Sequence, residues 1–327
     1  MPQLVLKKAD GTHHFKVSGK AALLDELSES GFPLNFSCRK GDCGQCAATP
    51  LSGEFAVLNI AVPWQQGSQI LLCNARAVGD VAIEIEHLPE LEDIRHQRSP
   101  CKIVQLNKLS ANVLEVLLRL PPNAGFRFLP GQHVRLTNRA KVTRSYSLAE
   151  PPNPDNLLRI HVRRMEEGAF SHYLFHEAAA NDLLHLEGPA GTFFPRKSLA
   201  AKKLIFLATG TGIAPIYAIL LNLASAGRLP GEVTLIWGNR RREDAYLDDA
   251  LKALQLKFPF HYRCLYSREA AVDAGPRHVQ DVLLEKDLLD AVVLAAGAPE
   301  MVRDARSHCC KLGLPEANFL ADPFTSS

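Results

Sequence analysis

The sequence lacks the features that mark membrane proteins, secreted proteins and general binders of nucleic acid. No stretch of its 327 residues approaches the roughly eighteen consecutive apolar side chains of a membrane-spanning helix. The first residues lack the apolar run and the small-residue cleavage site of a signal peptide, so we expect a cytoplasmic protein. Lys and Arg number 37 against 35 Asp and Glu, and this net charge of +2 argues against nucleic acid or a membrane surface as the partner.

The composition is that of an ordinary globular protein with more than one domain. Because 46% of the residues are hydrophobic and 22% are charged, disorder, collagen and coiled coil are excluded. The length of 327 residues exceeds the roughly 250–300 at which a single core stops growing, so two or three domains are expected. Residues 1–100 carry a charge of −3 and the remainder +5, which indicates an acidic N-terminal module with its own docking partner.

Four of the eight cysteines have a spacing that predicts a metal cluster rather than disulfides, since cytosolic thiols stay reduced. Cys38, Cys43 and Cys46 form C-x4-C-x2-C, and Cys73 follows after 26 intervening residues. This is the plant-type [2Fe–2S] pattern, in which four thiolates converge on two irons. Zinc is the alternative, but zinc sites usually show paired C-x2-C knuckles and only one such pair is present.

The loop between these cysteines supports the cluster. We expect Gly41 and Gly44 to adopt positive φ, which lets the loop curl and aim its N–H groups at the sulfides. The later cysteines have no ligand spacing and are interpreted as small hydrophobic residues: Cys101, Cys264, Cys309 and Cys310. The run His308–Cys310 is not taken as a metal site, because adjacent residues of a helix point to different faces.

Short strands and one helix surround the predicted cluster. A hairpin is expected at Asp10–Gly11, a helix over 21–30 and a strand over 81–85. This pattern resembles the plant-type ferredoxin domain of the β-grasp fold over residues 1–88. The polar segment 89–100 is bracketed by prolines and is interpreted as an interdomain linker.

A second domain is expected over 101–199, where short strands separated by turns favour an antiparallel barrel. Alternation puts Arg144 and Tyr146 on one face of a strand. A guanidinium suits a phosphate, and a tyrosine ring suits stacking on a flat heterocycle. Together with the downstream segments 161–164, 168–171 and 188–193, Arg144-Ser145-Tyr146-Ser147 resembles the FAD domain of the ferredoxin–NADP⁺ reductase family.

The resemblance implies roles for these residues. Arg144 would hold the flavin pyrophosphate, Tyr146 would stack on the isoalloxazine, and Ser147 would lie near flavin N5. The ribityl and adenosine side would be lined by His161, Val162 and Arg163. Gly168 and Ser171 would cap a helix N-terminus that faces phosphate.

A third domain over 200–327 shows the strand, glycine turn and helix that cradle a dinucleotide. A buried strand over 204–208 leads into the turn 209–215, and helical periodicity follows over 216–224. Two further apolar runs, 233–238 and 291–297, each end in glycine, which favours a parallel sheet. The turn reads G-x-G-x-x-P rather than the Rossmann G-x-G-x-x-G.

This domain resembles the pyridine-nucleotide domain of the same family, and the resemblance again implies roles. The dinucleotide would be cradled by Gly210, Thr211, Gly212 and Pro215, and the adenosine ribose would be approached by Gly238, Asn239 and Arg240. Gly297 and Met301 match part of the family's C-G-x-P-x-M, and Ala296 stands where its cysteine is usual, so we expect a modest change in nicotinamide positioning. Phe324, in the terminal segment 322–324, would lie by the flavin and complete a catalytic set with Tyr146 and Ser147.

The resemblance spans the whole chain in the order ferredoxin, FAD, NAD(P). It identifies a ferredoxin–FAD–NAD(P)H reductase of the ferredoxin–NADP⁺ reductase superfamily, most similar to the CDP-6-deoxy-Δ3,4-glucoseen reductase group through segments 100–103, 118–122, 144–147 and 235–240. Such an enzyme passes electrons from NAD(P)H through FAD and the [2Fe–2S] cluster to a protein acceptor. The acceptor would be a dehydratase, with an oxygenase component as the alternative, and a monomer is expected.

Two questions stay open at the level of sequence. Ser267 and Arg268 resemble the pair that NADP-linked members use, and Arg277 could add a cation. The clustered arginines 240–242 also occur in NADH-linked relatives, whose group the full-length match favours, so NADH is predicted with NADPH as the alternative. A redox-sensing interaction protein is a third function, but no recognisable DNA-reading element supports it.

Overall fold

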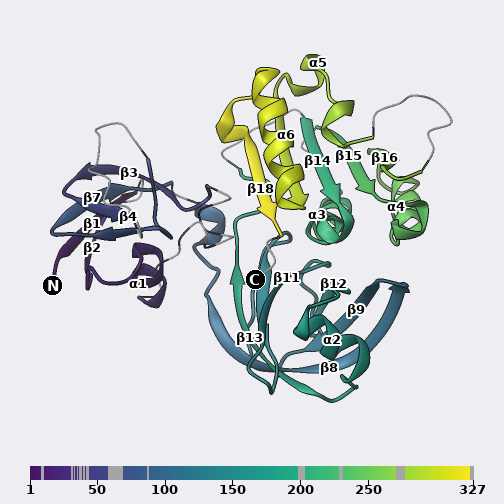
Figure 1. Cartoon of the computed structure of the whole chain (residues 1–327), viewed down its shortest axis with the longest axis horizontal. Coiled ribbons are helices and arrows are strands. Elements are labelled where there is room, and N and C mark those ends of the chain that lie inside the picture. The colour runs from purple at the N-terminus through teal and green to yellow at the C-terminus, as the bar shows by residue number, and fades with distance from the viewer. Residues whose placement is uncertain are drawn as a thin grey trace. The chain divides into compact units, whose positions relative to one another are not determined.

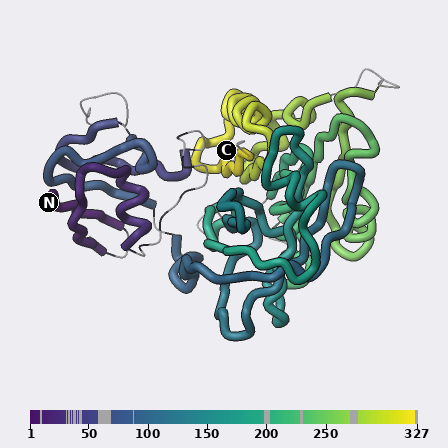
Figure 2. Tube along the Cα trace, turned by 60° about the horizontal axis from the view of Figure 1, so that its bottom comes forward, coloured from purple at the N-terminus to yellow at the C-terminus, as the bar shows by residue number. Residues whose placement is uncertain are grey.

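The computed structural model describes residues 1–8, 11–30, 32, 34, 36, 39, 41, 44–57, 69–86, 88–197, 203–227, 231–269 and 277–324. The chain divides into two compact units, Met1–Arg95 and His96–Ser327 (Figure 1, Figure 2). Among the described residues, no helix combines the length and the apolar character needed to cross a membrane.

The described residues of the first unit form a mixed sheet and one α-helix, as expected for a ferredoxin domain. Its sheet has the order β2-β1-β7-β3-β5, in which β1 pairs antiparallel with β2 and parallel with β7. The strands are β1 (Gln3–Lys8), β2 (Gly11–Lys16), β3 (Ala47–Ser52), β5 (Ile70–Leu71) and β7 (Val81–Glu84), with β4 (Phe55–Val57) and β6 (Ala75–Ala77) as a separate ribbon. Helix α1 (Leu23–Glu29) buries Leu23, Leu24 and Leu27 and is shorter than the predicted helix.

The second unit begins with the expected antiparallel barrel. Six strands follow the order β11-β10-β13-β8-β9-β12, and a bridge between Leu148 and Ile160 joins the two ends of the sheet. They are β8 (Gln97–Ser110), β9 (Val113–Arg119), β10 (His133–Thr137), β11 (Thr143–Ser147), β12 (Leu157–Arg163) and β13 (Leu183–Ala190), with helix α2 (Ala169–His176). Figure 1 shows β8 and β9 as long curved strands.

Strand β8 begins earlier than the apolar pattern predicts. Residues 97–100 of the predicted linker pair with β13, from Gln97 opposite Gly188 to Pro100 opposite His185. Their side chains are polar or proline and at least partly exposed, so the backbone pairing leaves no hydrophobic alternation in the sequence. The 3₁₀ helix Pro89–Leu91 precedes this strand.

The rest of the second unit is a parallel sheet, as predicted, and helices cover both of its faces. Its order is β16-β15-β14-β17-β18, from β14 (Lys203–Thr209), β15 (Glu232–Asn239), β16 (His261–Tyr266), β17 (Ala291–Gly297) and β18 (Phe319–Pro323). Helices α3 (Ile213–Ala226) and α4 (Asp248–Gln255) share one core with Phe206 and Trp237. Helices α5 (Glu285–Leu288) and α6 (Pro299–Lys311) share the opposite core with Leu207 and Val293.

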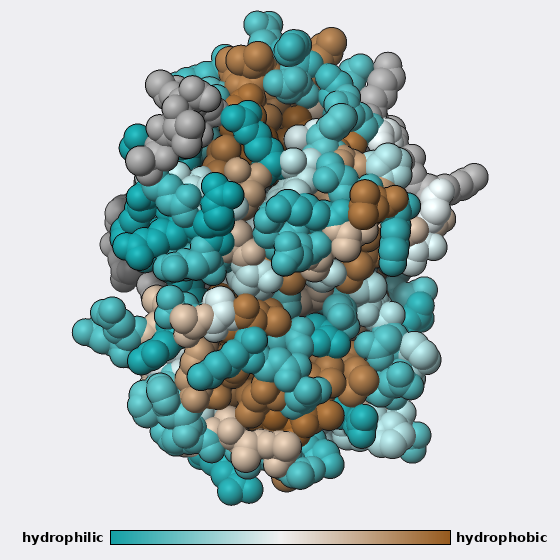
Figure 3. All heavy atoms as spheres, turned by 90° about the vertical axis from the view of Figure 1, so that its right-hand side faces the viewer, coloured by the Kyte–Doolittle hydropathy of each residue, from teal (hydrophilic) through white to brown (hydrophobic). Residues whose placement is uncertain are grey.

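The surface of this unit is polar over much of the face that Figure 3 presents, with apolar residues in separate groups. Among the described residues, the most exposed large apolar side chains include Leu256 and Leu289, which are 90% and 70% exposed. Single exposed leucines are ordinary on a soluble surface and indicate no docking site by themselves.

Candidate cofactor sites

Two of the four predicted cluster ligands meet in the first unit. The Sγ atoms of Cys46 and Cys73 are 3.3 Å apart, and both side chains are buried. The Leu72 N–H donates to the Cys46 carbonyl at 2.9 Å, which ties the turn that carries Cys73 to the loop that carries Cys46. The predictions for Cys38 and Cys43 lie outside the described residues.

The glycines of this loop have the predicted backbone. Gly41 has φ +89° and Gly44 has φ +73°, conformations that favour glycine. A Cβ on Gly41 would lie 2.4 Å from the Asn74 side-chain nitrogen, so the loop closes tightly on the turn that carries Cys73. Converging thiols within a glycine-shaped loop fit a [2Fe–2S] group.

The cysteines outside this loop behave as the sequence predicts. Burial raises the pKa of Cys101 to about 12. Burial, and then Cys310, raise the pKa of Cys309 to about 12. Both thiols therefore stay protonated at neutral pH and have little ligand character. Among the described residues, no group of three His, Cys, Asp or Glu is placed to hold a metal ion.

Strand β11 brings the predicted flavin residues to one place. The ring of Tyr146 packs against Phe170 of α2 with centroids 5.6 Å apart, and burial raises the pKa of the Tyr146 hydroxyl. Arg144 is half-buried, and its Nη1 donates to the Thr143 carbonyl at 2.7 Å. A guanidinium has five N–H donors, so this contact leaves others for an anion.

Helix α2 begins where the sequence predicts a phosphate-facing N-terminus. Gly168 is its N-cap, and no side chain caps its first turn. The Ser171 hydroxyl donates to the Gly168 carbonyl at 2.9 Å and accepts from the Met165 N–H at 3.2 Å. Ser171 therefore braces the loop, and the first-turn N–H groups are left as anion donors.

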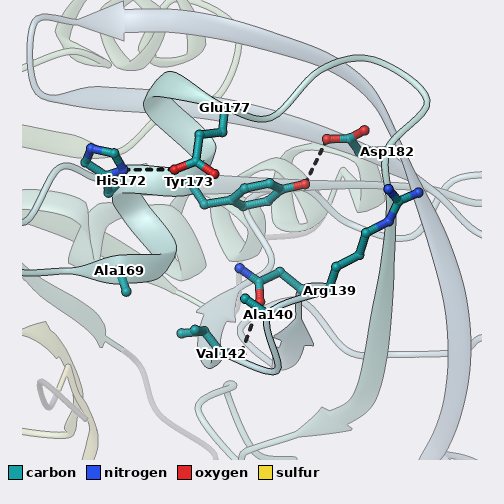
Figure 4. Close-up of a pocket in the computed structure, with 9 residues that line it drawn as sticks. Arg139, Ala140, Val142, Ala169, His172, Tyr173, Glu177 and Asp182 are labelled. Carbon is teal, nitrogen blue, oxygen red and sulfur yellow. Dashed lines mark hydrogen bonds and ion pairs between the residues drawn. The ribbon is translucent and has the colours of Figure 1, made fainter.

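A pocket that the sequence does not indicate lies between the β10–β11 turn and α2 (Figure 4). Its volume is about 510 Å³. Figure 4 shows Tyr173 across its middle, with Arg139 and Asp182 toward one side and His172 and Glu177 toward the other. The Tyr173 hydroxyl donates to Asp182 Oδ2 at 2.9 Å. The pocket walls come from three separated segments, and of the lining residues only Ala169 belongs to a segment that the sequence analysis singles out, which is why periodicity and spacing miss the pocket.

Strand β12 presents two of its three predicted residues on its outer face. His161 is buried, and its Nδ1 lies 3.1 Å from the Tyr246 hydroxyl of the parallel-sheet half. A Cβ on Gly210 would lie 3.1 Å from Arg163 Nη1. The Val162 side chain belongs to the barrel core, so only its main chain can meet a ligand.

The glycine turn of the third domain lies at the switch point of the parallel sheet. After β14 the chain builds β15 and β16 on one side, and then β17 and β18 on the other. The crevice at the carboxyl ends of β14 and β17 is where such sheets bind nucleotides. A Cβ on Gly212 would lie 2.1 Å from the Ala296 carbonyl, and one on Gly297 2.3 Å from Thr209 Oγ1, so both turns require glycine.

The other residues predicted to meet the dinucleotide lie in the glycine turn, in α3 directly after it, and in α6. Gly210, Thr211 and Gly212 form a 3₁₀ turn directly before α3. Pro215 is buried in the first turn of α3, and Met301 is half-buried in α6.

Two predicted ribose-side segments meet at the ends of β15 and β16. The Ser267 N–H donates to the Asn239 carbonyl and the Arg268 N–H to the Arg240 carbonyl, each at 2.9 Å. Gly238 lies beside them, and the side chains of Arg240, Arg268 and Arg277 are exposed. Arg242 differs, because its guanidinium lies over the Tyr266 ring at 5.0 Å and pairs with Glu269 at 3.7 Å.

Ser147, one of the predicted catalytic residues, is hydrogen-bonded to Asp322 across 175 residues of sequence. The buried Ser147 hydroxyl donates to Asp322 Oδ2 at 3.2 Å, and the Phe324 N–H donates to the Gly297 carbonyl at 2.7 Å. The end of β11, the end of β17 and the terminal segment therefore meet at one point of the second unit. The Phe324 ring is half-buried there.

Comparison with known proteins decides the family. Three family models match in order: a 2Fe-2S iron-sulfur cluster binding domain over residues 7–78, an oxidoreductase FAD-binding domain over 100–194, and an oxidoreductase NAD-binding domain over 206–307. Over 320 residues the chain is 32% identical to the CDP-6-deoxy-L-threo-D-glycero-4-hexulose-3-dehydrase reductase of Yersinia pestis, with 96% of each chain covered. The chain belongs to the ferredoxin–FAD–NAD(P)H reductase family.

Other members of this reductase family are equally similar. Reductase component 1 of the terephthalate 1,2-dioxygenase of a Comamonas species is 32% identical, with 94% of this chain and 93% of that one covered. The solved ferredoxin reductase of carbazole 1,9a-dioxygenase shares the fold, with a TM-score of 0.68, 24% identity, and coverage of 99% and 98%. The reductase is therefore an enzyme that uses NAD(P)H, FAD and a [2Fe–2S] cluster for electron transfer.

Proposed function

We propose that this reductase delivers electrons to a dehydratase that acts on a nucleotide-linked deoxyhexulose. The observation that carries this proposal is the 32% identity to the Yersinia pestis dehydrase reductase over 96% of both chains, with all three modules in the same order. When bound, the nicotinamide, the flavin and the cluster would together convert the electron pair of one hydride into two single electrons. The expected monomeric state and cytoplasmic location stay predictions.

The chain's own residues hold and orient these groups. Arg144 and the first-turn N–H groups of α2 both offer donors to the flavin pyrophosphate, and both are available on one side of the barrel. Tyr146 offers a ring braced by Phe170. For the cluster, Cys46 and Cys73 would act with Cys38 and Cys43.

The pocket of Figure 4 would take the adenosine end of FAD. It lies beyond Arg144, at the opposite end of β11 from Ser147, and α2 supplies both its wall and the phosphate-facing N-terminus. Tyr173 and Val142 give it apolar surface, and Arg139 and Asp182 give it polar groups, a mixture that suits a purine and a ribose.

Ser147 and Asp322 would orient the reacting face of the flavin. Both side chains are buried, and the Asp322 carboxylate accepts from the Ser147 hydroxyl. This bond fixes the rotamer of Ser147, so that its oxygen is held at a defined place and water is kept out. Ala296 adds no polar side-chain atom there, and because the single Ser147 O–H is donated to Asp322, the Ser147 oxygen would meet the flavin as an acceptor.

NADH is proposed as the electron donor. Arg240 and Arg268 are exposed beside one another at the ends of β15 and β16, which keeps NADPH as the alternative. The full-length similarity to the dehydrase reductase favours NADH. Steady-state kcat/KM with each nucleotide tests the choice, and a clear preference for NADPH would contradict it.

The acceptor is tested by reconstitution. The holoenzyme is mixed with NADH and either a purified CDP-6-deoxyhexulose dehydrase or the oxygenase component of terephthalate dioxygenase, and turnover of each acceptor is followed. We expect multiple turnovers with the dehydrase. Faster turnover with the oxygenase would support the second function, which rests on the equal 32% identity to the Comamonas reductase component. Cluster reduction without turnover of either acceptor would favour a redox sensor.

A further inference from the structure

One strand of the barrel meets the parallel-sheet half through its outward side chains. Arg159, His161 and Arg163 alternate along β12 with residues of the barrel core, so all three lie on its outer face. His161 contacts Tyr246, and Arg163 approaches Gly210. Arg159 is held by Glu115 at 2.5 Å and by Glu150 at 2.8 Å. The strand predicted to hold FAD is thus also a boundary with the nucleotide-binding half.

His161 is neutral in this boundary. Burial lowers its pKa to about 4, against the opposing effect of Glu115 and with a smaller contribution from Arg159. Its Nε2 lies 3.9 Å from Glu115 Oε2, which for a neutral ring is no ion pair. The nearby carboxylate favours the tautomer with its proton on Nε2, and Nδ1 is then an acceptor.

Tyr246 supplies the donor for that nitrogen. Burial raises the pKa of its hydroxyl, so it remains protonated and donates to His161 Nδ1 at 3.1 Å. The same ring meets Trp237 edge to face, with centroids 5.6 Å apart and planes at 87°. The Trp237 Nε1–H donates to the Gly210 carbonyl at 2.9 Å. A continuous set of contacts therefore runs from β12 to the glycine turn.

We propose that His161, Tyr246 and Trp237 form a latch that fixes the Gly210–Gly212 turn against strand β12 and so aligns the nicotinamide with the flavin. The three are positioning residues, since they act through the turn and the strand. Alignment matters because a displacement of about 1 Å between reacting groups can cost on the order of a hundredfold in rate. The inference rests on the proposed nucleotide site at this turn.

Tyr246→Phe tests the latch, with Tyr262→Phe as the matched control. The Tyr262 hydroxyl donates to Asp248 at 2.8 Å within the parallel-sheet half, so the control loses a similar hydrogen bond away from the barrel. In stopped-flow reduction of the holoenzyme, Tyr246→Phe should lower the limiting rate of flavin reduction by about fivefold, the worth of one hydrogen bond. The NADH dissociation constant should stay within about twofold, because the latch acts on alignment rather than on nucleotide contacts.

A second variant distinguishes the hydrogen bond from packing. His161→Gln keeps an acceptor for the Tyr246 hydroxyl and should retain more activity than His161→Leu, which keeps only volume. If Tyr246→Phe and Tyr262→Phe reduce flavin at the same rate, or if His161→Gln and His161→Leu are equally impaired, the latch is wrong.

Hydrogen exchange separates the latch from the nucleotide site. In the holoenzyme, Tyr246→Phe should speed exchange at residues 209–213, whereas Tyr262→Phe should not. Added NAD⁺ should slow exchange there in the wild-type protein. If NAD⁺ protects this segment but Tyr246→Phe leaves its exchange unchanged, only the latch fails. If NAD⁺ gives no protection there, the nucleotide site itself is misplaced.

Discussion

The two units of this reductase build their cofactor sites in different ways. In the first unit, three predicted ligands lie within nine residues, Cys38–Cys46, and one follows at Cys73. In the second unit, Ser147 and Asp322 are hydrogen-bonded across 175 residues of sequence. A loop carries most of the cluster site, whereas strand order and domain packing assemble the flavin and nucleotide sites.

This difference predicts different responses to mutation. A cluster needs every one of its four thiolates, so the loss of one removes the whole group. The proposed flavin and nucleotide sites would share their binding energy among a guanidinium, ring faces, helix N–H groups and glycine turns. The loss of one contact there should weaken binding without abolishing it.

The largest expected effect is loss of the cluster in Cys46→Ala. The variant should contain no [2Fe–2S] group and lose cytochrome c reduction by at least about a hundredfold, beyond what removal of an outer-shell partner costs a metal site. FAD content and NADH–ferricyanide activity should persist, because the flavin site belongs to the other unit. Iron content, visible spectra and both activities measure this.

Cys101→Ala is the matched control, since Cys101 is another buried cysteine and lies in the barrel. It should retain both the cluster and cytochrome c reduction. Equal loss of ferricyanide and cytochrome c activity in Cys46→Ala would contradict the order in which electrons pass from flavin to cluster.

The same contrast explains how much the sequence could predict. Local sequence pattern predicts the cluster ligands, the positive φ of Gly41 and Gly44, and the parallel sheet. The structure confirms the two φ angles and the parallel sheet. The glycine turn at 210–212 is also confirmed at the end of a buried strand, because buried parallel strands are continuous apolar runs.

The features that the sequence could not predict all depend on distant partners. The sequence predicts a flavin-side role for His161, but it gives no sign that the ring also contacts Tyr246, a residue with no motif of its own. The pocket of Figure 4 draws its wall from three segments. The start of β8 at Gln97 is a backbone pairing whose polar side chains leave no pattern. Side-chain periodicity indicates which face of an element is buried, but it does not indicate which distant segment covers that face.

The next effect is a loss of stability in acid that belongs to the second unit. His161 has an ordinary pKa of 6.5 when unfolded and about 4 when folded. Above pH ~6.5 the His161 ring is neutral in both the folded and the unfolded state. As the pH falls from there toward 4, only the unfolded chain takes up the proton. The free energy of unfolding therefore falls by up to about 3 kcal/mol. Burial raises the pKa of Glu115, but hydrogen bonds from Asn107 and Arg159 outweigh it, so the pKa is lowered. Glu115 therefore changes the free energy of unfolding only below about pH 4.5.

Denaturant unfolding at pH 7.5 and at pH 5, monitored through the release of FAD, measures this loss of stability. His161→Gln does not titrate and should flatten the dependence over that interval. Tyr246 and Arg159 also face this ring, and both keep their charge state between these pH values. Bleaching of the cluster should show the same pH dependence in wild type and variant. An unchanged slope in His161→Gln would show that this histidine is accessible to protons in the folded state.

A smaller effect is expected from Arg144→Ala. Removal of a charge-assisted contact to the pyrophosphate should weaken FAD binding by roughly ten- to a hundredfold. Arg135→Ala is the control, because Arg135 is a half-buried arginine on the neighbouring strand β10 that pairs with Glu187 at 3.5 Å. FAD titration of the apoprotein measures both. Full flavin affinity in Arg144→Ala would place the pyrophosphate elsewhere, while the cluster spectrum should not change in either variant.

The smallest effect concerns nucleotide choice. The Arg268 side chain is exposed, and the backbone N–H of this residue donates to the Arg240 carbonyl at the ends of β15 and β16. An exposed cation near a 2′-phosphate contributes up to about 1 kcal/mol and is screened by salt, so Arg268→Ala should lower kcat/KM for NADPH by no more than about fivefold. The value for NADH should stay unchanged, because NADH lacks that phosphate. Arg242→Ala is a control whose side chain is already engaged by Glu269 and Tyr266. A strong preference of the wild-type enzyme for NADPH that is lost in Arg268→Ala would contradict this prediction. It would show that the Arg268 side chain is directed into the site when nucleotide binds, and it would assign the chain to the NADPH-linked reductases.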